Sequence, residues 1–127
     1  MGERVKVVGI DHIVLNVADI EASLAFYCDL LGMEAVRLEE WRAKKCRFPS
    51  VRVSADTIID LAPGTRSGEN LDHFCLIIEP ADLEALVASG DFDVSGGVGS
   101  RYGAKGNGNS FYVRDPDGNR IELRYYD

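Results

Sequence analysis

The sequence has few of the residues on which several common classes of protein depend. It contains three cysteines without a Cys-x-x-Cys spacing, which argues against a disulfide framework. No apolar run approaches the ~20 residues of a membrane span, and Met1–Val8 lacks the apolar core of a signal peptide. Fourteen Lys and Arg against 21 Asp and Glu give a net charge of −7, which disfavours nucleic acid and anionic membranes as partners. We therefore expect a cytoplasmic protein with reduced thiols.

Motifs that mark several kinds of active site are also missing. The chain has no His-Glu-x-x-His motif and no Ser-His-Asp arrangement with supporting context. Its segment Gly96–Gly108 holds six glycines but neither of the glycine-rich phosphate-binding motifs. We expect this segment to be a mobile rim over a pocket or, alternatively, a solvated loop. As a rim, it would present four side chains to an oxygen-rich ligand: Arg101, Tyr102, Lys105 and Asn107.

What the sequence does contain is one order of strands and helices that occurs twice. With 127 residues, of which 46% are apolar, the chain fits a single domain, 1–127. We divide it into two modules, 5–62 and 71–126, joined by a turn-rich linker, 63–70. The first module predicts a strand, an amphipathic helix that ends at Gly32, and three more strands. These are Val5–Val17, Ile20–Leu31, Ala35–Glu40, Lys44–Arg52 and Thr57–Ala62.

The second module repeats this order. Its first strand is predicted at Leu71–Ile78, and a short helix follows, with Pro80 at its first position and its end at Gly90. Each module would be marginal alone, so we expect an α+β fold in which the two share a core. The remaining strands are predicted at Phe92–Val94, Val98–Lys105, Ser110–Arg114 and Arg120–Tyr126, the last two joined by a turn at Asp115–Gly118.

Equivalent residues in the two modules indicate an internal duplication. Asp11-His12 opens the first module and Asp72-His73 opens the second, so the histidines are 61 residues apart. Asp60 and Glu122 each lie between an Ile and a Leu near the module ends, and they are 62 residues apart. Nearly equal offsets are typical of a repeated structural unit.

Strand alternation gives these four polar residues one chemical interpretation. Each points away from the apolar face of its strand, so curled sheets would bring two imidazoles and one or two carboxylates together in a cup. Neutral nitrogen and anionic oxygen are the ligands that a divalent transition metal prefers. We therefore predict His12, His73 and Glu122 as metal ligands. Asp60 is a fourth ligand, a base beside the metal, or a hydrogen-bonded strand residue.

Two segments of the chain resemble the vicinal oxygen chelate superfamily. They are Asp11–Val17 with the following helix, which includes Phe26-Tyr27 and leads to Leu31-Gly32-Met33, and the ending Tyr112–Leu123. This superfamily includes glyoxalase I, type I extradiol dioxygenases, fosfomycin-resistance thiol transferases and bleomycin-resistance binding proteins. The resemblance covers nearly the whole chain.

The resemblance implies a fold, a metal and a class of reaction. The fold would be two paired βαβββ modules that form an open, cup-like mixed β-barrel. One divalent ion (Fe, Ni, Zn, Mn or Co) would be held by His12, His73 and Glu122, with Asp60 where glyoxalase I proteins place a fourth carboxylate, normally Glu. Exposed sheet edges make a homodimer plausible.

We therefore expect a metal-dependent lyase or dioxygenase that chelates a small-molecule substrate or intermediate through vicinal oxygens. Glyoxalase-like lyase or isomerase chemistry is slightly favoured, with Glu122 or Asp60 moving a proton between adjacent carbons. One alternative is an Fe(II) extradiol dioxygenase or a thiol transferase that confers resistance. Another is a non-catalytic protein that sequesters a drug or other ligand, as bleomycin-resistance proteins do.

Overall fold

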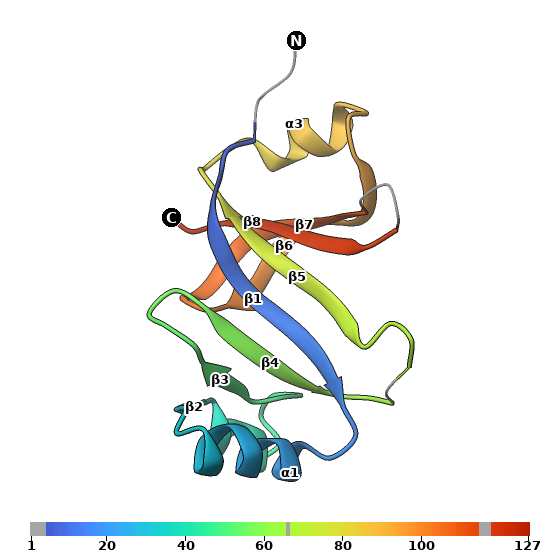
Figure 1. Cartoon of the computed structure of the whole chain (residues 1–127). Helices are drawn as coiled ribbons and strands as arrows, with labels where there is room; N and C mark the ends of the chain where they lie inside the picture. The colour runs from blue at the N-terminus through green and yellow to red at the C-terminus, as the bar shows by residue number, and fades with distance from the viewer. Residues whose placement is uncertain (1–4, 66, 115–117) are drawn as a thin grey trace. The chain divides into compact units, whose positions relative to one another are not determined.

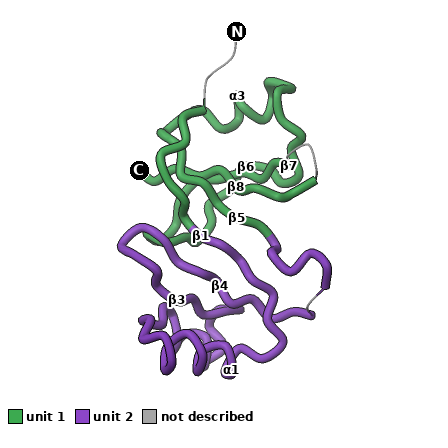
Figure 2. The backbone as a smooth tube through the Cα atoms, viewed as in Figure 1, with its two compact units in different colours: residues 1–11, 73–127 green, residues 12–72 purple. Residues whose placement is uncertain are grey.

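The computed structural model describes residues 5–65, 67–114 and 118–127 (Figure 1). It divides into two compact units, residues 12–72 (unit 2) and residues 1–11 with 73–127 (unit 1) (Figure 2). The predicted turn at Asp115–Gly118 lies outside the described residues, apart from Gly118. The same holds for Arg66 of the predicted linker and for the first four residues of Met1–Val8.

Unit 2 has the predicted βαβββ order with an additional short helix. Its strands lie in the order β2-β3-β4-β1; β1 and β4 are parallel, and the other neighbours are antiparallel. Helix α1 packs its apolar side on β3 and β4 to form the core of the unit, with Ile20, Leu24, Val51 and Leu61 buried. The elements are β1 (Val7–Val17, from His12 onward in this unit), α1 (Ile20–Leu24), η1 (Ala25–Leu30), β2 (Ala35–Val36), α2 (Leu38–Arg42), β3 (Ser50–Arg52) and β4 (Ile58–Pro63).

The predicted helix over Ile20–Leu31 is present, but its second half is a π-helix. The Asp19 carboxylate caps the first turn by accepting the Ala22 N–H. In η1 the Leu31 N–H donates to the Phe26 carbonyl, five residues back, so the ladder widens there. The helix ends at Gly32, whose φ of 73° suits a glycine.

The predictions of strands at Ala35–Glu40 and Lys44–Arg52 are wrong over much of these two ranges. Only Ala35–Val36 and Ser50–Arg52 are strands, and α2 lies between them. Glutamates in the first turn of α2 and Arg42 in its last turn complement the helix dipole. The strand prediction was based on local propensity and did not take these charges into account. Leu38 and Trp41 pack against the core of unit 2, so the helix is retained by tertiary contacts.

Unit 1 also follows the βαβββ order. Its strands lie in the order β1-β5-β8-β7-β6, with β5 and β8 parallel and the last three antiparallel. Helix α3 begins after an Asp82 cap instead of at Pro80, and its leucines pack on the apolar face of β7 and β8. The elements are the start of β1, β5 (Leu71–Ile78, from His73 in this unit), α3 (Leu83–Ala88), β6 (Asp93–Gly103), β7 (Gly106–Arg114) and β8 (Arg120–Tyr125).

The glycine-rich segment Gly96–Gly108 is a paired β-hairpin, which agrees with the strand predicted at Val98–Lys105 and contradicts the alternative of a solvated loop. It belongs to β6 and β7, which pair from Asp93↔Arg114 to Gly103↔Gly106, with register shifts on both sides of Gly96. Close packing explains Gly96, because a Cβ there would come within 2.9 Å of the Tyr112 ring. Gly106 has a φ of 96° at the turn.

The architecture confirms the α+β class, the mixed sheet and the two βαβββ modules. Each module has a parallel pair of strands flanked by an antiparallel pair. Among the described residues, no helix combines the length and apolarity needed to cross a membrane.

Candidate functional site

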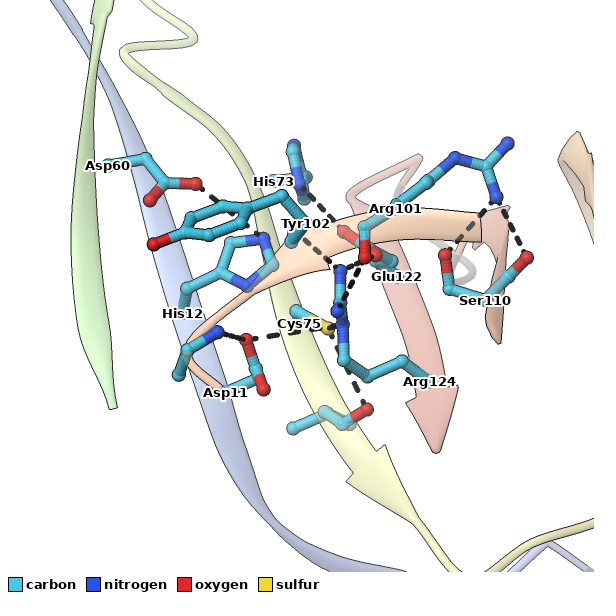
Figure 3. A network of polar contacts seen from close by, with 12 residues as sticks. Asp11, His12, Asp60, His73, Cys75, Arg101, Tyr102, Ser110, Glu122 and Arg124 are labelled. Carbon is cyan, nitrogen blue, oxygen red and sulfur yellow. Dashed lines mark hydrogen bonds and ion pairs between the residues drawn. The ribbon is translucent and has the colours of Figure 1, made fainter. Parts of the chain in front are cut away.

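In unit 1, the structure brings His73 of β5 and Glu122 of β8 together. The two strands are parallel, and their register sets Cys75 opposite Glu122, which leaves His73 two residues away on the same face. His73 Nε2 lies 3.2 Å from Glu122 Oε1, and the two side chains are 10% and 1% exposed (Figure 3). The pair is therefore a buried contact between an imidazole nitrogen and a carboxylate oxygen.

Unit 2 contains the equivalent pair, His12 of β1 and Asp60 of β4. Their strands are also parallel, and Val14 is opposite Asp60, as Cys75 is opposite Glu122. His12 Nε2 lies 3.8 Å from Asp60 Oδ2, and both side chains are 3% exposed (Figure 3). The shorter aspartate leaves a wider separation, beyond hydrogen-bond distance.

In each unit a different donor holds the second oxygen of the carboxylate. Arg124 Nη2 donates to Glu122 Oε2 at 2.6 Å, whereas the Ser50 hydroxyl donates to Asp60 Oδ1 at 2.5 Å. Asp60 thus accepts from a neutral hydroxyl and Glu122 from a charged guanidinium, and the bond to the charged donor is the stronger kind. In both cases the other oxygen is the one near the histidine.

Tyr112 contacts both members of the unit 1 pair. It lies opposite Glu122 in the β7–β8 register, and its ring meets the His73 ring edge-on at 5.2 Å. The guanidinium carbons of Arg101 and Arg120 lie 4.8 Å and 3.9 Å from the ring centroid. Burial and then the charge of Glu122 raise the pKa of Tyr112 to about 12, so its hydroxyl remains protonated at neutral pH.

Beside the pair, unit 1 holds a second buried carboxylate, Asp11. It accepts the Ala104 N–H at 2.8 Å and the Tyr126 hydroxyl at 2.5 Å. Burial, followed by this hydrogen bond, raises the pKa of Tyr126 to about 12. Asp11 therefore ties the start of β1 to the β6–β7 turn.

The four residues predicted to bind substrate lie on the β6–β7 hairpin but have different environments. Arg101 donates to the Ser110 carbonyl and hydroxyl at 2.8 Å and 3.2 Å and stacks on Tyr112, which places it beside the His73–Glu122 pair. Tyr102 pairs with Asn107 across the hairpin. Asn107 and Lys105 are exposed. Arg101 is thus linked to the pair through Tyr112, and the Tyr102 carbonyl accepts from Arg124, which also donates to Glu122.

The donor types in the two pairs fit a divalent transition metal. Each pair offers one imidazole nitrogen and one carboxylate oxygen, and neither includes a thiol. The Cys75 thiol, which lies nearby in sequence, instead accepts the Arg124 Nε–H at 3.3 Å. A divalent ion takes four or more ligands, so the two donors of one pair are too few to complete a site.

Sequence reasoning did not identify Arg124, Ser50 or Tyr112 as parts of the site. A signal was nevertheless present in the pattern. Arg124 follows Glu122 by two residues, so strand alternation alone puts both on one face. Ser50 and Tyr112 became recognisable only when strand register placed them opposite Asp60 and Glu122.

Comparisons with known proteins agree with this fold. A family model described as the Glyoxalase/Bleomycin resistance protein/Dioxygenase superfamily matches residues 9–123. Virulence protein STM3117 of Salmonella typhimurium is 31% identical over 121 residues, covering 92% of this chain and 83% of the relative. A probable lactoylglutathione lyase of Synechocystis is 30% identical over 124 residues, covering 88% and 91%.

A solved structure of low identity has the same fold. The Mn(II)-bound glyoxalase from Novosphingobium aromaticivorans superposes with a TM-score of 0.69 at 21% identity, over 96% of this chain and 40% of that one. The family match extends over both βαβββ modules and over all four paired residues. It confirms the resemblance to vicinal oxygen chelate proteins. The chain belongs to the Glyoxalase/Bleomycin resistance protein/Dioxygenase superfamily.

Proposed function

We propose that this protein is a metal-dependent enzyme that acts on a small molecule through two neighbouring oxygens. In this proposal His12, His73 and Glu122 hold one divalent ion, and Asp60 is a fourth ligand or a base beside it. The observation that carries the proposal is that one histidine–carboxylate pair is built twice, buried both times, at the same strand register.

The energetic cost of these pairs supports the proposal. A buried ionised carboxylate is costly unless it is paired or metal-bound. Besides Asp11, this chain buries Asp60 in the first module and Glu122 in the second. Asp60 accepts from the Ser50 hydroxyl at one oxygen, and a nitrogen of His12 lies 3.8 Å from the other. One ion shared by both modules would complete the ligand count that neither pair reaches.

The chemistry we favour is a glyoxalase-like lyase or isomerase reaction. When bound, the divalent ion supplies Lewis-acid stabilisation of negative charge on substrate oxygens. Glu122 accepts from the charged guanidinium of Arg124, whereas Asp60 accepts from the neutral Ser50 hydroxyl. We assign to Asp60 the task of accepting a proton from one carbon and returning it to the adjacent one. The 30% identity to a probable lactoylglutathione lyase supports this choice.

The proposal also covers the cellular compartment and the oligomeric state of the protein. Cys28, Cys46 and Cys75 are free thiols, which is consistent with a reducing compartment such as the cytoplasm. We also propose a homodimer, because strands β2 and β6 each end a row of paired strands and a second copy would cover such edges. Size-exclusion chromatography with light scattering tests this state; a monomer at micromolar concentration would contradict it.

The experiment that tests the function is elemental analysis of freshly purified protein, followed by assays with the metal found. Nickel, zinc, cobalt or manganese near one per chain, with isomerisation of a hemithioacetal, supports the lyase. Iron with oxygen uptake on catechols identifies a dioxygenase instead, and metal-dependent consumption of a thiol identifies a transferase. Metal-free protein that binds an aromatic compound stoichiometrically, without turnover, overturns the proposal in favour of ligand sequestration.

The matched variant for this test is His73→Ala. It should remove at least nine-tenths of the bound metal and leave the circular dichroism spectrum unchanged, because it deletes a proposed ligand and leaves the backbone pairing of β5 in place. Unchanged metal content would contradict its assignment.

A further inference from the structure

Arg124, on β8 of unit 1, is a completely buried arginine. A guanidinium has five N–H groups, and here each has an acceptor. They are Cys75 Sγ for Nε, the Arg101 carbonyl for Nη1, and the Tyr102 carbonyl and Glu122 Oε2 for Nη2 (Figure 3). Nη1 also donates to the Tyr126 hydroxyl. Such a side chain is fixed in position by its own contacts.

We propose that Arg124 is a positioning residue that sets the orientation of Glu122 for metal binding, an inference that rests on the proposed function. Its Nη2 holds Oε2 at 2.6 Å, and this leaves Oε1 on the side of His73, 3.2 Å from Nε2. A carboxylate held at one oxygen presents the other in a single direction, which lowers the entropy that metal binding must overcome.

The duplication supports a functional role over a purely structural one. The residues of unit 2 that correspond to Cys75 and Arg124 are Val14 and Ala62, which lie at the same places relative to Asp60. Unit 2 therefore forms the same strand pairing with no arginine there. The guanidinium is a feature of the second module alone, so the βαβββ architecture does not require it.

The surrounding backbone is also built to admit this side chain. A Cβ on Gly103 would overlap Arg124 Nη1 and the Tyr126 hydroxyl. The carbonyls of Arg101 and Tyr102 accept hydrogen bonds from the guanidinium of Arg124. The end of β6 therefore provides both the space and the acceptors that this side chain needs.

The test measures affinity for Mn²⁺ by competition with a chromophoric chelator. Wild type is compared with Arg124→Met and Arg124→Lys, and Arg114→Met serves as an exposed-arginine control on β7. We expect Arg124→Met to bind Mn²⁺ about 10- to 100-fold more weakly, as loss of a residue that orients a metal ligand does. Arg124→Lys should recover part of this loss, because lysine keeps the positive charge but lacks the planar set of N–H donors of the guanidinium. Arg114→Met should match wild type.

A purely structural role gives a different result. Arg124→Met would then lower the melting temperature, while the protein that remains folded at 10 °C would bind Mn²⁺ within about twofold of wild type; that outcome overturns the inference. If Arg124→Met does not fold, Gly103→Ala displaces the guanidinium without deleting it, and wild-type affinity there overturns the inference equally. Wild type that binds no divalent metal contradicts the proposed function itself, so the two failures are distinguishable.

Discussion

At the scale of single residues, Asp11 is a carboxylate that has no access to solvent and depends on its hydrogen bonds. Tyr126 donates to Oδ2 at 2.5 Å, and the tyrosine oxygen in turn accepts from Lys105 N–H and Arg124 Nη1. Removing that hydroxyl would leave an ionised oxygen buried without its donor, and would also remove an acceptor for the guanidinium.

We therefore predict that Tyr126→Phe lowers the free energy of unfolding by about 1–3 kcal/mol. Urea denaturation followed by circular dichroism measures this. Tyr125→Phe removes a hydroxyl from the neighbouring residue and should change stability by less than about 0.5 kcal/mol. Equal effects of the two substitutions would contradict the role assigned to Asp11.

Tyr112 and Tyr126 also predict a pH dependence. Both phenols have a pKa of about 12 in the folded protein, against 10 when unperturbed. Between these values the folded state binds more protons than the unfolded state, so stability is complete below pH 10 and falls as pH rises toward 12. Melting temperatures from pH 9 to 12 should show this fall, and it should be shallower in a Tyr112→Phe, Tyr126→Phe double variant. Parallel curves for both proteins would refute the assignment.

The sequence alone predicted the histidines and carboxylates of the candidate site but not the buried Arg124, and the difference has a physical reason. Histidine and carboxylate share a strand face in each half, and that follows from alternation alone. The burial of Arg124 does not, because its acceptors are backbone carbonyls of β6, a strand distant in sequence. A charged residue near the end of the chain is normally read as solvent-exposed.

At the scale of elements, the β6–β7 hairpin depends on glycines at particular positions. A Cβ on Gly103 would overlap Arg124 and Tyr126, whereas one on Gly97 of the same strand would meet no atom within 4 Å. We predict that Gly103→Ala lowers the free energy of unfolding by about 1–3 kcal/mol through steric strain. Gly97→Ala should be neutral or stabilise by up to about 1 kcal/mol, because alanine loses less backbone entropy. Thermal unfolding of both variants measures the difference, and identical melting temperatures would contradict it.

Element boundaries were predicted best where a local signal was strong. The Asp19 cap and Gly32 bounded the first helix correctly. Helix α2 was missed, because its five residues form fewer than two turns and are held by packing of Leu38 and Trp41 instead of by intrinsic propensity. The strand predicted at Val98–Lys105 overlaps β6, but the hairpin was not predicted over its full length. Gly96 and Gly103 there lie against a ring and a guanidinium, and these contacts cannot be inferred from the sequence pattern.

At the scale of the whole molecule, the proposed metal would link the stability of the two modules. A ligand that binds only the folded chain stabilises it by about 2.7 kcal/mol at 100 times its Kd. We predict that Mn²⁺ raises the melting temperature of chelator-treated wild type. His12→Ala and His73→Ala should each abolish that rise, although they lie in different units. Differential scanning calorimetry with and without the ion measures it; a full rise in either variant would limit the site to one module.

The register shifts in β6 have a consequence for the behaviour of this chain at high concentration. This outermost strand of unit 1 departs from regular pairing on both sides of Gly96. Irregularities of this kind bend and twist a strand, so its free edge is a poor template for an incoming extended peptide. Fibre growth from that edge is thereby discouraged, even when no other copy of the chain covers it.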